Sequence, residues 1–216
     1  MQIKLEPGKL LNKDGDLNQA GYANSLIKEY SRKDIKAKKS RIKEWDYYYI
    51  GNDKYGVALT IADNSYMSMC SLSFLDFEKK DDVTKSIIKF FSFGKLNMPS
   101  TSVSGDCFYE TKKVKMSFVH ENGKRHLTCS WKKFSKNKED LRLDLYLEET
   151  NEDSIVVATP FDKLAHFYYN QKINLLKANG YVKIGETIYD FTVFARTYRI
   201  CVAIRSVTEY NTIPYS

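Results

Sequence analysis

Hydrophobic and polar residues alternate along much of this chain with a period of two, which is the pattern of a β-strand half buried in a sheet. The clearest case is residues 141–148, where Leu occupies every odd position and Arg, Asp, Tyr and Glu occupy the even ones. Similar runs at residues 43–50, 55–62 and 66–77 are separated by clusters rich in Asn, Asp and Gly, which favour tight turns. We therefore expect residues 43–77 to form a three-stranded antiparallel meander.

Further strands follow from the same pattern. Residues 83–93 form one run, and residues 114–120 and 125–131 form a hairpin, because Asn122-Gly123 suits the positive φ angles of a type I′ turn. Weaker strands are expected at residues 155–158, 181–184 and 187–191, with 178–180 as a turn before the second of them. Only residues 24–30, capped by Asn24 or Ser25, have the composition of a short helix.

This regular spacing of strands predicts an all-β fold, an antiparallel meander closed into a lipocalin-like (calycin-like) β-barrel. The domain organisation that we expect has three parts. Residues 1–40 form an extended N-terminal arm, residues 41–150 form a first barrel-like domain, and residues 151–216 begin a second, incomplete β domain.

The strand at residues 43–50 has one aromatic face. Alternation places Trp45, Tyr47 and Tyr49 together, with Tyr48 among the residues of the opposite face. The next strand carries only small side chains at alternate positions, namely Gly56, Ala58, Thr60 and Ala62. If these small residues share the aromatic face, they leave room for a ligand. A register shifted by one residue would instead bring Tyr55, Val57, Leu59 and Ile61 to that face and fill the space. We expect the aromatic face to line an apolar cavity and interpret Trp45, Tyr47, Tyr48 and Tyr49 as ligand-binding residues.

Composition narrows the function classes. The formal net charge is +7, and the Lys residues behind it are spread over the whole chain, which favours a solvated surface over a nucleic-acid interface. No signal peptide and no apolar run of transmembrane length is present. The four cysteines form no CxxC pair, which favours buried free thiols in a reducing cytoplasm, although a bridge between Cys70 and Cys129 is an alternative.

Candidate chemistry rests on carboxylates. Asp46, Asp63 and Asp76 lie near aromatic residues, where the pKa of an aspartic acid can be altered enough for general acid catalysis. His120 and His126 flank the Asn-Gly turn, but a metal site there would need a third ligand, so we expect no metal. No phosphate-binding glycine loop or nucleophile motif is present, and no cofactor is expected.

Several segments resemble the bacterial domain-of-unknown-function family 2804, over a span from Gly8 to about Phe191. They are Gly21-Tyr22-Ala23, Ile35-Lys36-Ala37, Arg41 to Tyr49, Tyr55-Gly56, Ala62 to Tyr66, Phe74 to Phe77 and Lys172-Ile173-Asn174. The family is similar to lipocalin-like proteins of the carotenoid hydratase and tocopherol cyclase type, which pair two β-barrels and act on lipophilic substrates. The resemblance transfers no catalytic residue.

The chain departs from the family after Phe191. Family members continue with an Asp-Trp-Gly-Arg-Gly type segment that is absent here, and the tail 192–216 contains three Arg and no Lys. A truncated or frameshifted product and a genuine short variant both account for this. We expect the tail to pack poorly.

Two functions follow from these observations. One is a protein that binds a lipophilic small molecule, and the other is an enzyme that hydrates or cyclises an isoprenoid-like or other apolar substrate with an Asp as the acid. Membrane-surface attachment through the basic segment 33–43 is a third hypothesis.

Overall fold

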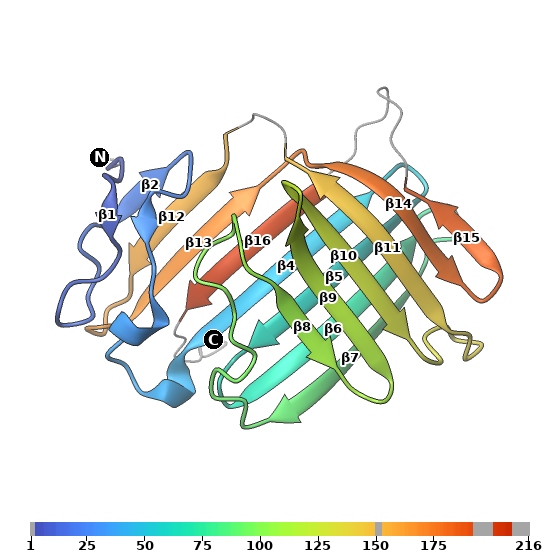
Figure 1. Cartoon of the computed structure of the whole chain (residues 1–216), viewed down its shortest axis with the longest axis horizontal. Coiled ribbons are helices and arrows are strands. Elements are labelled where there is room, and N and C mark those ends of the chain that lie inside the picture. The colour runs from blue at the N-terminus through green and yellow to red at the C-terminus, as the bar shows by residue number, and fades with distance from the viewer. Residues whose placement is uncertain (1–2, 150–152, 192–200, 209–216) are drawn as a thin grey trace.

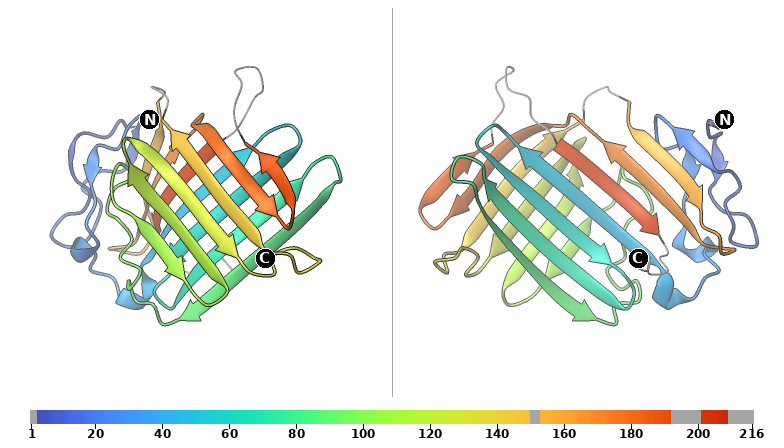
Figure 2. Two further views of the ribbon diagram at one scale, coloured as in Figure 1. Left: turned by 45° about the vertical axis from the view of Figure 1, so that its right-hand side comes forward. Right: turned by 180° about the vertical axis from the view of Figure 1, so that it is seen from behind.

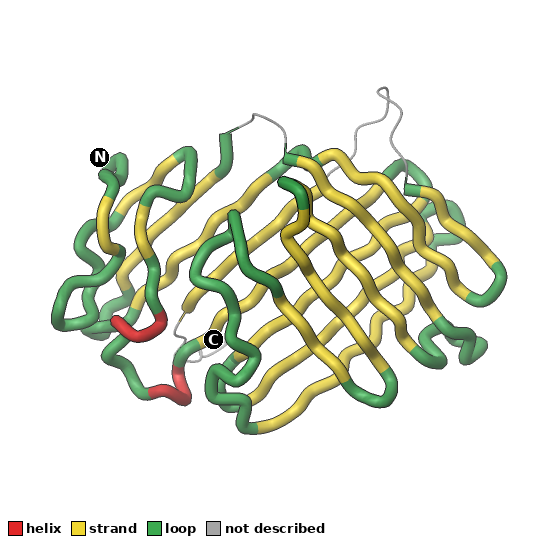
Figure 3. Tube along the Cα trace, viewed as in Figure 1, coloured by secondary structure: helices red, strands yellow, loops and turns green. Residues whose placement is uncertain are grey.

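The chain folds into two β-sheets that face each other, and the all-β prediction is confirmed (Figures 1 and 3). The computed structural model describes residues 3–149, 153–191 and 201–208, the last of these as a backbone strand. Its helical segments are two short 3-10 turns, η1 (Arg32–Asp34) and η2 (Lys39–Arg41). Among the described residues, no ladder joins the free edges of the two sheets, so the architecture is barrel-like but open, with two facing layers.

The larger sheet has eight antiparallel strands. In spatial order they are β2 (Gly21–Ala23), β12 (Ile155–Pro160), β13 (Phe167–Ile173), β16 (Cys201–Thr208), β4 (Lys43–Gly51), β5 (Tyr55–Asp63), β6 (Met67–Asp76) and β7 (Asp81–Phe90). Strands β4 to β6 are the expected meander, which is therefore confirmed. Figure 2 (right) shows this sheet from behind, with β4 to β7 in front of the other layer.

The smaller sheet has six antiparallel strands. They are β15 (Thr187–Asp190), β14 (Lys177–Ile184), β11 (Leu141–Glu148), β10 (Lys124–Trp131), β9 (Val114–Glu121) and β8 (Cys107–Glu110). The hairpin of β9 and β10 is confirmed, and Asn122 and Gly123 at its turn have φ angles of 51° and 75°. Strand β8 carries no strong alternation in sequence and was not predicted.

The apolar core lies between the two sheets. The Leu residues of β11 all point into it, where each is at most 3% exposed. From the larger sheet, Tyr48 and Ile50 meet them together with the inner face of β5, formed by Val57, Leu59 and Ile61. Apolar contact area of this extent is the main stabilising contribution to a two-layer fold.

Two local predictions were wrong. Residues 24–30 form no helix, because Lys28–Glu29 instead makes strand β3, which pairs in parallel with β1 (Gly8–Lys9). Residues 178–180 form no turn but lie inside β14, opposite β11. Gly180 is needed there because its φ is +137° and an added Cβ would lie 2.0 Å from the Asp144 carbonyl oxygen. The Asn179-Gly180 pair has the sequence of a turn, but here the glycine allows two strand backbones to approach closely.

The N-terminal arm covers one end of the larger sheet. A second apolar cluster holds it there, in which Leu5, Leu10 and Leu11 of the arm contact residues of β12 and β13. A buried polar cluster adds to this attachment: the Tyr30 hydroxyl donates to Glu44 Oε1 at 2.6 Å, and Arg32 pairs with the same carboxylate. The arm is thus attached to β12 and β13 by apolar contacts and to β4 through Glu44.

Residues beyond 150 contribute to both sheets. Strands β12 and β13 extend the larger sheet, while β14 and β15 extend the smaller one beside β11. Strands on both sides of the expected boundary at residue 150 thus take part in the same two sheets, and the division into domains stays a prediction. Part of the tail forms a strand: Cys201–Thr208 pairs with β13 on one side and β4 on the other, while the expected poor packing of its side chains stays a prediction. The rest of the tail lies outside the described residues.

Gly180→Ala should be more destabilising than Gly123→Ala, although both glycines have positive φ angles. An added Cβ at Gly123 meets no atom within 4 Å, so only the strained φ applies, at about 1 kcal/mol. At Gly180 the Cβ also meets backbone, and we expect a loss of about 3 kcal/mol or more in the free energy of unfolding. Urea denaturation of both variants measures the difference. Equal losses would contradict the close approach of β14 and β11.

The buried thiols should be unreactive in the folded protein. Cys70, Cys107 and Cys129 are buried thiols, and burial raises the pKa of Cys70 from its ordinary 9.0 to about 12. In a Cys201→Ser variant, iodoacetamide at pH 9 should modify the three thiols only after unfolding in urea. Cys70 loses its proton at lower pH in the unfolded chain than in the folded protein. The free energy of unfolding should therefore fall as pH rises from 9 to 12. In Cys70→Ala this fall should be less steep. Rapid alkylation without urea would contradict this burial.

Candidate functional site

The two faces of β4 have different environments. Glu44, Asp46, Tyr48 and Ile50 are buried on the inner face, while Trp45, Tyr47 and Tyr49 lie half-buried on the outer face. The expectation that the aromatic face points into the interior was therefore wrong. Tyr48 belongs to the core, where its ring meets Phe118 edge-on at 4.7 Å between centroids.

The outer aromatic face nevertheless carries a groove. Its volume is about 550 Å³, and it will be called the outer groove. The lining residues come from β4, β5, β6 and the turn after β5, and they are Trp45, Tyr47, Thr60, Ala62, Asn64 and Met69. Two of the four residues predicted to bind a ligand are among them.

The register between β4 and β5 explains why this space is open. Trp45 pairs with Ala62, Tyr47 with Thr60, and Tyr49 with Ala58, so the small residues share the aromatic face as expected. Side chains of this size leave the flanks of the large rings uncovered. The alternative register, which would have brought Val57, Leu59 and Ile61 outward, is excluded because those residues are fully buried.

Tyr49 lies at the far end of this face and does not line the groove. Its ring covers two glycines: an added Cβ would lie 2.6 Å from the Tyr49 Oη at Gly51 and 2.9 Å from it at Gly56. Burial raises the pKa of Tyr49 above its ordinary value. Burial also raises the pKa of Tyr47, and the neighbouring Tyr49 raises it further. Both phenols therefore stay neutral at physiological pH, as an apolar ligand would require.

The apolar surface continues beyond the outer groove toward the edge of the sheet. Met69 pairs with Ile88, and Met67 pairs with Phe90. Phe90 and Phe91 are 72% and 67% exposed, and Phe93 stacks on Phe91 at 6.1 Å between ring centroids. Sequence reasoning did not select these phenylalanines, although three of them within four residues at the end of a strand was an available signal.

The three candidate aspartates do not form one site. Asp46 is buried on the inner face of β4, and its Oδ2 lies 3.1 Å from the Cys107 thiol of the opposite sheet. Asp76 is a turn residue whose pKa is lowered by its hydrogen bonds with Lys79. Neither lines the outer groove.

The hydrogen bonds around Asp63 indicate a structural role. It is fully buried, and its Oδ1 accepts hydrogen bonds from the Ser65 and Gly94 amides and from the Ser92 hydroxyl, while Oδ2 accepts one from the Leu96 amide. A carboxylate that satisfies four donors in this way fixes the segment after β7 against the end of β5.

The histidines of the hairpin do not approach a common ligand position. His120 hydrogen-bonds the carbonyl oxygens of Gly105 and Ser102, whereas His126 stacks on Tyr146 and contacts Asp144 at 2.8 Å. Within the described ranges, no group of three His, Cys, Asp or Glu side chains could hold a metal ion. No helix of those ranges has the length and hydropathy needed to cross a membrane.

Asp63→Ala should cost about 3 kcal/mol or more of the free energy of unfolding, because it leaves buried amides and a hydroxyl without acceptors. Asp76→Ala, which removes an ion pair at a turn, should change the free energy of unfolding little. Chemical denaturation of both variants provides the comparison. A stable Asp63→Ala protein that has lost only ligand binding would contradict the structural role.

Comparison with solved structures shows a shared fold. The crystal structure of a Nitrosomonas europaea protein described as an AttH superimposes with a TM-score of 0.55 and 11% identity, covering 88% of this chain and 59% of that one. Kievitone hydratase from Nectria haematococca gives a TM-score of 0.43 with 11% identity, covering 95% of this chain and 59% of the hydratase. The chain thus spans about three fifths of the length of either structure.

Sequence comparison identifies the family. No curated protein matches the chain. The family model for a domain of unknown function, DUF2804, matches residues 1–197, which is most of the chain and agrees with the segments quoted above. This protein therefore belongs to the DUF2804 family.

Proposed function

We propose that this protein binds a lipophilic small molecule in the outer groove. The observation that carries the proposal is the pairing of large aromatic rings on β4 with small side chains on β5, which leaves about 550 Å³ open beside Trp45 and Tyr47. Ligand sites in proteins have volumes of roughly 300–1,000 Å³ and are lined mainly by apolar and aromatic side chains.

The chemistry of the lining favours an apolar ligand with few polar groups. An indole, a phenol ring, a thioether and an alanine methyl supply the apolar contacts. Thr60 and Asn64 supply the polar ones and could orient a hydroxyl or carbonyl group of the ligand. Among the described residues, no charged side chain lines the groove, so burying a charged ligand group beside them would be unfavourable.

The exposed phenylalanines beside the groove support the same proposal. Contiguous apolar surface of this kind is uncommon on soluble proteins unless it has a binding role. The row from Met69 through Ile88 connects the groove with the Phe90 region. An apolar ligand could therefore approach the groove without crossing a charged surface.

Acid-catalysed hydration or cyclisation has less support. Such a reaction needs a carboxylic acid beside the bound alkene. Asp46 lies on the inner face of β4, opposite the groove, and Asp63 is bound to the segment after β7. A binding role requires neither residue to be near the ligand.

Trp45→Ala should weaken binding of the uncharged fluorescent probe N-phenyl-1-naphthylamine by about tenfold, which corresponds to about 1.4 kcal/mol of lost contact. Ala62→Leu should weaken it similarly by filling the groove while leaving Trp45 in place. Fluorescence titration measures both. Tyr146→Ala, which removes a partly exposed aromatic ring from the other sheet, is the matched control and should not change affinity.

Thermal denaturation separates binding from folding. Trp45 is half-buried, so its variant should melt only a few degrees below the parent. If both groove variants bind the probe as tightly as the parent protein does, the aromatic face has no ligand-binding role.

A further inference from the structure

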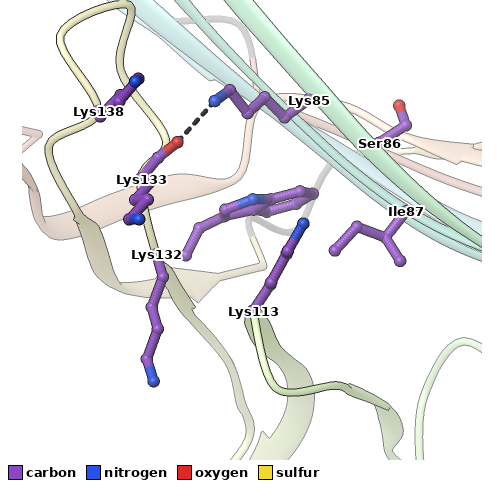
Figure 4. A pocket seen from close by; sticks show the side chains of 8 residues that line it. Lys85, Ser86, Ile87, Lys113, Lys132, Lys133 and Lys138 are labelled. Carbon is purple, nitrogen blue, oxygen red and sulfur yellow. Dashed lines mark hydrogen bonds between the residues drawn. The ribbon is translucent and has the colours of Figure 1, made fainter.

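A second hollow lies at the free edge of the larger sheet. There β7 faces the start of β9 and the end of β10 (Figure 4). Its volume is about 560 Å³, and it will be called the lysine pocket. The residues that line it are Lys85, Ser86, Ile87, Lys113, Trp131, Lys132, Lys133 and Lys138. It shares no residue with the outer groove.

The lysine pocket concentrates positive charge without compensation. Five of its eight lining residues are lysines, and none is acidic. Within the part of the chain that the structure describes, these five form no ion pair. Two carboxylates of adjoining segments have other partners: Asp81 pairs with Lys136, and Asp140 accepts a hydrogen bond from the Lys133 amide. Positively charged side chains around a cleft, with no acidic residue among them, attract anions to it.

Three of these lysines occupy positions that usually favour other residue types: Lys85 on an inner strand face, and Lys133 and Lys138 at positive φ angles. Lys85 occupies the inner face of β7 between Val83 and Ile87, and its ammonium donates to the Lys133 carbonyl oxygen at 2.6 Å. Lys133 and Lys138 have φ angles of 55° and 65°, which favour Gly or Asn. Lysine at a strained position suggests a role for the charge itself.

The floor of the lysine pocket is apolar. Trp131 is buried in the core and packs edge-on against Phe134 at 5.9 Å between ring centroids. Figure 4 shows Lys113 and Ile87 pointing toward one another across the pocket, whereas Lys132 points away from them. A ligand here would meet a charged rim and an apolar base.

We propose that the lysine pocket binds a small organic phosphate monoester, with the phosphate among the lysines and an aromatic or aliphatic group against Ile87 and Trp131. A phosphate dianion matches a site lined by several lysines better than a single carboxylate does, because each lysine is a point charge with rotatable donors on a flexible side chain. An adjoining hollow of about 520 Å³ also contains Lys113 and Lys132, which extends the positive surface around the entrance.

Phenyl phosphate serves as the probe, with inorganic phosphate and phenol as its two halves. In isothermal titration calorimetry at 150 mM NaCl, phenyl phosphate should bind at least tenfold more tightly than either half. The double variant Lys113→Gln/Lys138→Gln should weaken its binding at least tenfold. Lys13→Gln/Lys163→Gln, which removes two exposed lysines elsewhere, should leave it unchanged.

Tryptophan emission locates the bound probe. The chain has two tryptophans, so Trp45→Phe leaves Trp131 as the sole reporter, and its emission should change on addition of phenyl phosphate. Lys85→Gln, which can keep the hydrogen bond to Lys133, provides a second variant should the double variant fold poorly. Equal weakening by the pocket and control variants, or equal affinity for inorganic phosphate, would overturn the proposal. Absence of saturable binding would do so as well.

Discussion

The strict alternation of side chains along β4 determines the arrangement of the rest of the molecule. One face must close the core against the leucines of β11, and only the face with Tyr48 and Ile50 supplies apolar groups that fit between the sheets. Once that face points inward, the pleat sends Trp45 and Tyr47 outward. The same constraint acts on β5, whose branched residues fill the core and whose small residues lie on the outer face. Packing in the interior thereby produces open space on the exterior.

The strands from β4 to β7 and from β9 to β12 were predictable because alternation and turn residues are local signals, whereas short strands such as β8 were not. What alternation cannot provide is the choice of face, since that depends on the second sheet and on contacts distant in sequence. Trp45 and Tyr47 were correctly grouped with Thr60 and Ala62, but the group was assigned to the wrong side of the sheet. The lysine pocket was not predicted at all, because segments around residues 85, 113 and 131–138 meet only in the folded chain. One glycine was interpreted wrongly. Gly180 was expected in a turn, but it lies in β14 and permits the close approach of β11.

Buried carboxylates in this fold hold segments together, and their surroundings explain why sequence alone presented them as candidate acids. Glu44 joins the N-terminal arm to β4 through Tyr30 and Arg32, and Asp63 joins the segment after β7 to the end of β5. An acid among aromatic residues in sequence looks the same whether it protonates a substrate or accepts main-chain hydrogen bonds. Only the list of donors around each oxygen distinguishes the two.

Strand β7 is the last strand of the larger sheet. The unpaired edge of such a strand can recruit another chain and start aggregation. Its inward-facing Lys85 opposes such growth, because an added strand would crowd an ammonium group that needs either water or a strong acceptor. The residue that brings positive charge into the fold therefore also helps to keep the protein from polymerising through its exposed edge.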